Sequence, residues 1–201
     1  MDAVQLMNRT DTKFILSRKN LAEILAVLPE HYRVLAVNDV RLNRYETLYY
    51  DREDFHYYRQ HQNGKRNRYK IRKRSYVDSN LTYFEVKFKS NKDRTDKQRT
   101  KLSSLEESLE EKSVNFLHEA TPLEDTLVPK LYNSFRRITL VNEAIKERLT
   151  IDTDIRFQFE GRSVSLPHLV IAEVKQEKVN RHSPFMKEIK KRLIRPESIS
   201  K

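Results

Sequence analysis

The strongest constraint on the fold of this chain is a regular alternation of charged and apolar residues over several short stretches. Between residues 66 and 74, every even-numbered position carries Lys or Arg, whereas Tyr69 and Ile71 occupy odd-numbered positions. Stretches 83–89 and 148–159 repeat this polar and apolar division. Successive side chains of a strand point to opposite faces, so each stretch predicts a β-strand with one charged face and one apolar face.

Two interpretations of these strands differ in where the charged faces point. In an ordinary half-buried antiparallel sheet, the apolar face covers a core and the charged face lies in water. Here basic residues dominate strand after strand, and opposed like charges destabilise a sheet unless a bound polyanion neutralises them. The sequence therefore favours an α+β fold, an antiparallel β-barrel with a polar, basic interior that is flanked by helices.

The overall charge supports a polyanionic partner. Lys and Arg total 40 against 29 Asp and Glu, which gives a formal net charge of +11. The chain has no cysteine and only two glycines, and no run approaches the ~18 apolar residues that span a bilayer. We expect a single domain over residues 1–201, a cytoplasmic location and no intrinsic membrane segment; the oligomeric state is left open.

The remaining sequence predicts further strands and about five helical pieces. Asn63 and Gly64 predict a turn, and Ser103 and Ser104 are candidate helix caps before an acidic first turn. The expected strands are 9–16, 32–37, 45–50, 68–76, 81–89, 93–99, 135–141, 148–159 and 169–177. The expected helices are 19–28, 54–61, 103–119, 123–134 and 184–193.

The chemistry of the charged faces fits a phosphate chain. Arg offers a planar fork that matches two phosphate oxygens, while Lys is a mobile point charge. Positions two apart on a strand lie roughly 6.5 Å apart, so Arg72 and Arg74 can contact adjacent phosphoryl groups. Acidic residues on the same faces either pair with neighbouring Arg or hold Mg²⁺ or Mn²⁺, and both roles stay open at this point. They are Glu85, Asp152, Asp154 and Glu173.

A series of short motifs resembles, in order, the VTC polyphosphate polymerase domain of the triphosphate tunnel metalloenzymes, relatives of the CYTH phosphatases. The resemblance runs from about residue 8 to residue 201. Its motifs are Arg9-x-Asp11-x-Lys13-Phe14, Arg72-x-Arg74-x-Tyr76, Glu85-Val86-Lys87, Lys97-x-Arg99, Phe135-Arg136-Arg137, Arg148 through Asp152 to Asp154, Glu173-Val174-Lys175 and Ser200-Lys201.

This resemblance implies a basic tunnel and gives the residues roles. It implies transfer of the γ-phosphoryl group of ATP to a polyphosphate chain, with release of ADP and with Mn²⁺ or Mg²⁺ as cofactor. Glu173 matches the carboxylate associated with the metal. The residues expected to act in catalysis are Arg72, Arg74, Lys87, Arg137 and Arg148. Those expected to bind phosphate are Lys13, Arg72, Arg74, Lys87, Lys97, Arg99, Arg137, Arg148, Lys175 and Lys201.

The sequence is also compatible with three functions other than polymerisation. The first is hydrolysis of tripolyphosphate or another triphosphate, in which water replaces the chain end as acceptor. The second is a polyphosphate-binding module without turnover, which Phe135 and Ser198 favour because the family usually has Tyr and Lys there. The third is RNA binding through the basic stretch 65–74. RNA binding would need basic and aromatic side chains on an outward-facing surface where nucleobases could stack. The strictly even-numbered positions of the basic residues argue against this arrangement, so no nucleic-acid partner is expected.

Overall fold

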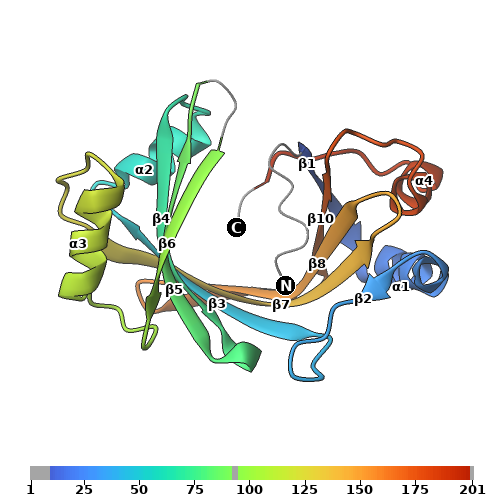
Figure 1. Ribbon diagram of the computed structural model, residues 1–201, viewed down its shortest axis with the longest axis horizontal. Coiled ribbons are helices and arrows are strands. Elements are labelled where there is room, and N and C mark those ends of the chain that lie inside the picture. The colour runs from blue at the N-terminus through green and yellow to red at the C-terminus, as the bar shows by residue number, and fades with distance from the viewer. Residues whose placement is uncertain (1–9, 92–94, 200–201) are drawn as a thin grey trace. The chain divides into compact units, whose positions relative to one another are not determined.

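The computed structural model describes residues 10–91 and 95–199. Its described strands form one hydrogen-bonded sheet in the order β1-β10-β8-β7-β3-β4-β5-β6, with β2 paired to β7 and β9 to β8 (Figure 1). The strands are β1 (Thr10–Ser17), β2 (Arg33–Val34), β3 (Asn43–Asp51), β4 (Arg68–Tyr76), β5 (Leu81–Lys89), β6 (Thr95–Leu102), β7 (Val128–Asn142), β8 (Glu147–Phe159), β9 (Arg162–Leu166) and β10 (Leu169–Gln176).

Four α-helices and two short 3-10 turns complete the α+β fold. The helices are α1 (Arg18–Val27), α2 (His56–Gln62), α3 (Glu111–Ala120) and α4 (Pro184–Lys191); the turns are 28–30 and 77–79. Strands β1 and β6 are the two ends of the described strand order, so the sheet is not a fully closed barrel. Within the described ranges, no helix has the length and apolar character needed to cross a membrane.

The chain divides into two compact units, which are described separately. The first unit contains residues 10–44, 135–156 and 165–199; the second contains residues 45–91, 95–134 and 157–164. Serine residues cap the starts of α1 and α4: the Ser17 side chain accepts a hydrogen bond from the Asn20 backbone N–H, and the Ser183 side chain, just before Pro184, accepts one from the Met186 backbone N–H.

In the first unit, α1 and α4 cover the apolar face of β1, β10 and β8 (Figure 1). The core contains Phe14 from β1, Ile24 from α1 and Phe185 from α4, and the rings of Phe14 and Phe185 meet edge to face with centroids 5.8 Å apart. Leu149 and Val174 complete it from β8 and β10. These are the odd positions of β8 and the even positions of β1 and β10, so the opposite face of the same strands is left for polar residues.

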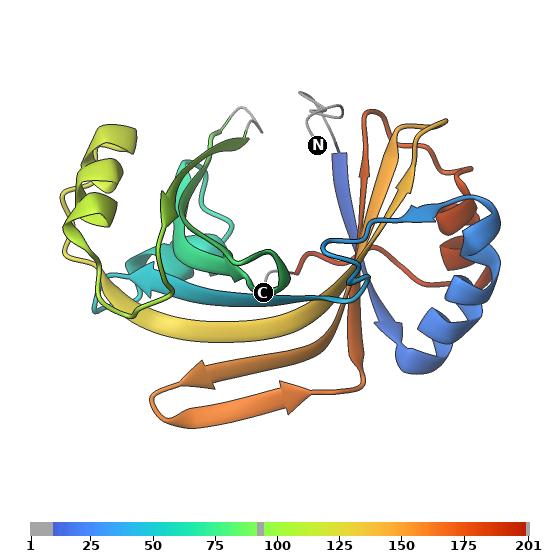
Figure 2. The same ribbon diagram turned by 60° about the horizontal axis from the view of Figure 1, so that its bottom comes forward.

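In the second unit, β3 to β6 form an antiparallel sheet whose apolar face is covered by α3. Ile71 of β4 and Phe84 of β5 are buried there, and Phe116 and Leu117 of α3 pack against this cluster. Figure 2 shows α3 on the outer side of these strands and β8 with β9 as a hairpin. The hairpin turns at Glu160 and Gly161, whose φ values of 47° and 71° are those of a two-residue hairpin turn.

Most of the expected elements are confirmed, but two predicted helices are wrong. The segment expected as helix 103–119 becomes helical only at Glu111, because Lys73 and Tyr50 bond to backbone carbonyls upstream. The Lys73 Nζ donates to the carbonyls of Glu106 and Ser108 at 2.9 and 2.6 Å, and the Tyr50 hydroxyl donates to that of Glu107 at 2.8 Å. These tertiary bonds hold carbonyls that a helix would use.

The segment expected as helix 123–134 instead enters strand β7 at Val128. Leu123 and Leu127 pack on the second core from an extended segment, so their helical spacing was misleading. The strand expected over 32–37 is shortened to two residues, because Asn38 and Asp39 take positive φ in a turn between Val37 and Val40. Strand β9 was not predicted; it is short and exposed, with Val164 56% exposed.

Candidate functional site

The charged residues on the polar face of β4, β5 and β6 in the second unit are almost all cations. Register places alternate residues of these three strands side by side on this face. Among the described residues of these three strands, Glu85 is the one carboxylate on it. We call this surface the cationic face: Arg68, Lys70, Arg72 and Arg74 of β4, Lys87 and Lys89 of β5, and Lys97, Arg99 and Lys101 of β6.

One row across the cationic face consists of lysines alone. Lys70 pairs in register with Lys87, and Lys87 pairs with Lys97. Directly opposed residues have Cβ atoms about 4.5–5.5 Å apart, and like charges at that spacing destabilise a sheet. Three lysines therefore lie side by side on adjacent strands, with Lys97 also bonded to Glu85 of the neighbouring row, and an anion bound across them would lower their mutual repulsion.

The neighbouring row holds Glu85, the one carboxylate that the described residues of β4, β5 and β6 place on this face. Arg72 donates from Nε and Nη2 to Glu85 Oε2 at 2.8 and 2.6 Å, and Lys97 Nζ lies 2.5 Å from Oε1. Glu85 is 1% exposed. Burial raises the pKa of Glu85, but Arg72 and Lys97 outweigh it and lower that pKa to about 2. Glu85 is thus a fixed anion that orients two cations and cannot neutralise the rest of the face.

Tyr49 of β3 reports the local potential. It pairs in register with Arg72, its hydroxyl lies 3.4 Å from Arg72 Nη1, and Lys70 Nζ lies 5.7 Å from its ring centre. Burial raises the pKa of Tyr49, yet Arg72, Lys70 and Arg74 overcome this and lower the pKa to about 8. A phenol that ionises this readily indicates a strongly positive site, which attracts anions.

The polar face of the first unit is balanced in charge. Register aligns Lys13 with Glu173, and Lys175 with both Asp11 and Arg148. We call this surface the mixed face: Asp11 and Lys13 of β1, Glu173 and Lys175 of β10, Arg148 and Asp152 of β8, and Arg137 of β7. Three carboxylates stand among four cations on it, in contrast with the cationic face.

Ion pairs organise the mixed face. Arg137 grips Asp152 through two bonds, Nε to Oδ1 at 2.6 Å and Nη2 to Oδ2 at 2.7 Å. Lys175 Nζ lies 2.8 Å from Asp11 Oδ2 and 3.2 Å from Glu173 Oε2. Burial raises the pKa of Glu173, but the nearby cations, Lys175 foremost, lower it overall. Glu173 is therefore a carboxylate held ready in its charged form.

Glu173 is also the residue expected to hold a divalent metal. Across the described parts of the chain, no group of three His, Cys, Asp or Glu residues is arranged to hold a metal ion. Mg²⁺ and its analogues keep several waters and are commonly bound by one or two carboxylates together with substrate phosphates. A single ionised carboxylate beside Lys and Arg side chains fits a metal that would arrive with a triphosphate.

The acidic residues of these strands differ in their partners and in the face on which they lie. Glu85 and Asp152 serve as ion-pair partners of Arg, one of the two roles left open by the sequence. The expectation that Asp152 and Asp154 share a face is wrong. Asp154 has a positive φ of 53° and contacts Arg18 of α1 and Arg136, the neighbour of Arg137 on the opposite side of β7. It belongs to the helix side.

The predicted site residues fall into two groups. The cationic face brings together Arg72, Arg74, Lys87, Lys97 and Arg99; the mixed face brings together Lys13, Arg137, Arg148, Lys175 and Glu173. Lys201 lies outside the described residues. Lys70 was missed as a site residue although the even-position rule includes it. Tyr49 was also missed, because nothing in the sequence pairs β3 with β4.

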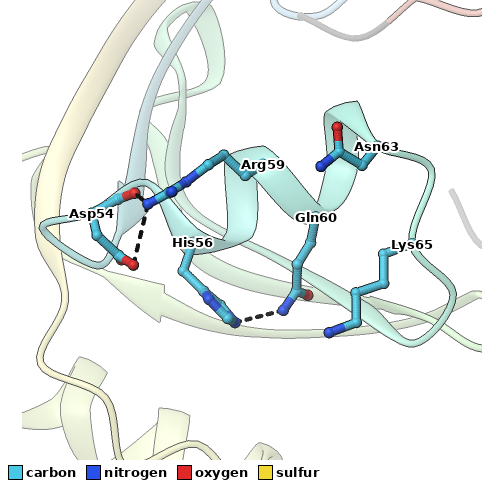
Figure 3. Close-up of a pocket in the computed structure, with 6 residues that line it drawn as sticks. All are labelled: Asp54, His56, Arg59, Gln60, Asn63 and Lys65. Atoms are coloured by element: carbon cyan, nitrogen blue, oxygen red, sulfur yellow. Dashed lines mark hydrogen bonds and ion pairs between the residues drawn. The ribbon is translucent and has the colours of Figure 1, made fainter.

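A separate shallow pocket lies along α2 in the second unit, and none of the predicted site residues lines it. Figure 3 shows its six lining residues, Asp54, His56, Arg59, Gln60, Asn63 and Lys65. Arg59 forms an ion pair with Asp54 at 3.2 Å, and Gln60 bonds to His56 at 2.5 Å. The opposite charges of Arg59 and Asp54 are thus paired with each other, and the two polar faces remain the candidate functional surfaces.

Comparison with known proteins supplies the family. The family model described as the VTC domain matches residues 8–201. The chain belongs to the VTC domain family. No curated protein matches it.

Solved structures show that this VTC domain has the triphosphate tunnel fold. It superposes on a candidate adenylate cyclase from Bacillus halodurans with a TM-score of 0.60 and 14% identity, covering 96% of this chain and 94% of that one. A candidate adenylyl cyclase from Hippeastrum, described as having a dominant triphosphatase activity, gives 0.54 and 10% over 97% and 93%. At these identities the likeness concerns the fold alone.

Proposed function

We propose that this VTC domain is a metal-dependent polyphosphate polymerase that uses ATP. The observation that carries the proposal is the cationic face, above all the row Lys70–Lys87–Lys97, which a phosphate chain would neutralise. Membership of the VTC family supports polymerisation over other reactions of a triphosphate. The substrates would be ATP and polyphosphate, or another triphosphate.

The reaction asks the protein for charge and position more than for a nucleophile. A terminal phosphate oxygen of the polyphosphate chain attacks the γ-phosphorus of ATP, the bond from that phosphorus to the β,γ-bridging oxygen breaks, and ADP leaves with the electron pair. Phosphoryl transfer spreads negative charge over the transferred group, so Arg forks and Lys charges placed on it lower the barrier. The attacking oxygen is already anionic and needs no general base.

In this proposal each face has its own task. Arg72, Arg74 and Lys87 would act in catalysis by neutralising the phosphoryl oxygens, with Lys97 and Arg99 binding the same ligand. On the mixed face, Arg137 and Arg148 would act likewise, Lys13 and Lys175 would bind phosphate, and Glu173 would hold Mn²⁺ or Mg²⁺. The metal, when bound, would neutralise phosphate charge. Lys201 is retained as a phosphate-binding proposal.

Hydrolysis of a triphosphate is a second candidate, favoured by the triphosphatase activity described for the Hippeastrum protein. The same cations would bind the substrate, and water would replace the chain end as the attacking group. A third candidate is binding without turnover. Phe135 is buried, and its ring centre lies 5.2 Å from the guanidinium carbon of Arg137. This residue favours binding without turnover, because Phe supplies no hydroxyl donor.

One incubation separates the three. Purified protein is given ATP and Mn²⁺, with and without a short polyphosphate primer, and products are followed by phosphorus NMR and gel electrophoresis. Polymerisation gives ADP and chains that lengthen with time. Free phosphate without chain growth supports hydrolysis instead. Tight binding with neither product at any metal concentration supports the binding module.

A further inference from the structure

Three tyrosines stand at one end of the cationic face and belong to neither hydrophobic core. Tyr45 of β3 pairs in register with Tyr76 of β4, and Tyr83 of β5 pairs with Arg74. All three side chains are only partly buried. We call Tyr45, Tyr76 and Tyr83 the tyrosine group; because it lies on the face away from α3, packing of the core does not account for it.

The rings of the tyrosine group are arranged edge to face. The centroids of Tyr45 and Tyr76 lie 5.0 Å apart with planes at 62°, and those of Tyr76 and Tyr83 lie 6.0 Å apart at 87°. Edge-to-face packing of this kind holds the rings in fixed orientations. The group is a rigid aromatic surface at the border of a phosphate-binding sheet.

Two guanidinium groups extend this surface. The Arg99 guanidinium carbon lies 4.5 Å from the ring centre of Tyr83, and that of Arg74 lies 6.0 Å from the ring centre of Tyr45. Planar cations on aromatic rings form stacking layers that accept a further flat ring. Aromatic side chains combined with Arg are the groups on which proteins stack nucleobases without reading their edges.

The order of residues along β4 gives the cationic face a direction. Tyr76, Arg74, Arg72 and Lys70 follow one another at alternate positions, so the tyrosine end and the lysine row lie about 20 Å apart along the strand. That span is comparable with an extended nucleoside triphosphate. A bare phosphate chain has no group that would use the aromatic end.

We propose that the tyrosine group binds the nucleobase of a nucleoside triphosphate whose phosphates extend toward the row Lys70–Lys87–Lys97. The inference rests on the proposed function and deepens it, because it makes the nucleotide, and not only its phosphates, a recognised part of the substrate. It assigns to the second unit both ends of the donor nucleotide.

The test compares two ligands that differ only by the nucleoside. The affinities of β,γ-imido ATP and of inorganic imidotriphosphate are measured by calorimetry in the presence of Mg²⁺. We expect the wild-type protein to bind the ATP analogue more tightly. Tyr83→Ala or Tyr45→Ala should weaken the ATP analogue about tenfold, as expected for loss of one stacked base, and leave imidotriphosphate within about twofold.

Matched variants make the result specific. Tyr83→Phe keeps the ring and should keep the affinity, and Tyr58→Ala removes a tyrosine that is 59% exposed on α2 and should change nothing. Equal weakening of both ligands, or no weakening of the ATP analogue, overturns the inference. Equal wild-type affinity for the two ligands also overturns it, without any variant. If the wild type binds neither ligand, the proposed function itself fails and the inference with it.

Discussion

The cationic face of the second unit and the mixed face of the first are built from the same kind of strand, yet they manage charge in opposite ways. On the mixed face, Asp11, Asp152 and Glu173 stand among four cations, two of which, Arg137 and Lys175, form ion pairs with them. On the cationic face, the described strands β4 to β6 offer one carboxylate, Glu85, against nine Lys and Arg residues. The mixed face is therefore close to charge balance, whereas the cationic face carries a large excess of positive charge.

The difference teaches where to look for the substrate and where to look for the metal. A surface whose charges are unbalanced in the free protein gains most from a bound polyanion, because the ligand removes repulsion as well as adding contacts. A surface with ionised carboxylates held among cations suits a hard cation that travels with phosphate. Variants on the two faces should therefore fail in different ways.

The largest expected effect is loss of turnover in Arg74→Ala. Arg74 donates to Thr47 Oγ1 at 3.1 Å, and its removal takes a planar cation from the centre of the cationic face. We expect turnover to fall by about 10³-fold, the scale seen when a preorganised charge-stabilising group is lost. Initial rates of ADP release measure it. Arg59→Ala, which removes an exposed Arg of α2, is the control; full activity in Arg74→Ala contradicts the assignment.

Glu173→Ala should reduce turnover less than Arg74→Ala does, and its loss of activity should depend on the metal concentration. Loss of a metal-associated carboxylate is expected to reduce activity about 10–100-fold, and added Mn²⁺ should recover part of it, because the substrate phosphates still bind the ion. Activity measured against Mn²⁺ concentration gives the readout. Arg74→Ala should show no such recovery. A Glu173→Ala variant with wild-type metal dependence removes Glu173 from the metal site.

Glu85→Gln tests the fixed anion of the cationic face. The folded-state pKa of about 2 lies below the ordinary Glu value of 4.5, so the ionised form stabilises the fold above pH 4.5 and this contribution is lost as pH falls toward 2. The shift corresponds to about 3 kcal/mol of the free energy of unfolding. Urea unfolding across this pH range measures it. Glu85→Gln should be less stable at neutral pH and should lack that part of the acid-induced loss.

The bound ligand should sharpen the contrast between the faces. In Glu85→Gln, tripolyphosphate should raise the melting temperature more than in the wild type, because Arg72 and Lys97 have lost their carboxylate. Asp152→Asn frees Arg137 on the mixed face, where carboxylates remain, and should gain less from the same ligand. Equal gains in both variants would mean that the two faces do not differ as described.

The smallest effect is the titration of Tyr49. Its pKa of about 8 in the folded chain lies below the ordinary value of 10, so the folded state should gain stability as pH rises from 8 to 10. Ultraviolet absorbance should detect one tyrosinate forming near pH 8, absent in Tyr49→Phe. A bound triphosphate should raise this pKa by neutralising Arg72 and Lys70. An unchanged titration on binding argues that the phosphates lie elsewhere.

Much of this architecture could be predicted from the sequence, because strand alternation is a local signal. The alternation of basic and apolar positions sufficed to predict strands such as β4 and β5 with one charged and one apolar face. Tertiary hydrogen bonds could not be predicted from this local signal. Lys73, at an odd-numbered position among apolar neighbours, is buried and bonds to backbone carbonyls of the segment before α3. The same bonds explain why the helix predicted from residue 103 begins at Glu111.

Cross-strand register was the other element that the sequence could not supply. The lysine row and the contact of Tyr49 with Arg72 depend on which residues of β3, β4, β5 and β6 lie opposite one another, and nothing local sets this. The single domain over 1–201, the cytoplasmic location, the choice of metal and the roles of individual site residues stay predictions.

The most direct measurement of the central claim uses a double variant of the lysine row, Lys70→Gln with Lys87→Gln. Its affinity for inorganic polyphosphate and its ligand-free free energy of unfolding are determined together. The account predicts that affinity falls at least about tenfold while the ligand-free protein is as stable as the wild type or more so, because like charges no longer oppose each other. Unchanged affinity, or a loss of ligand-free stability with affinity retained, would contradict it.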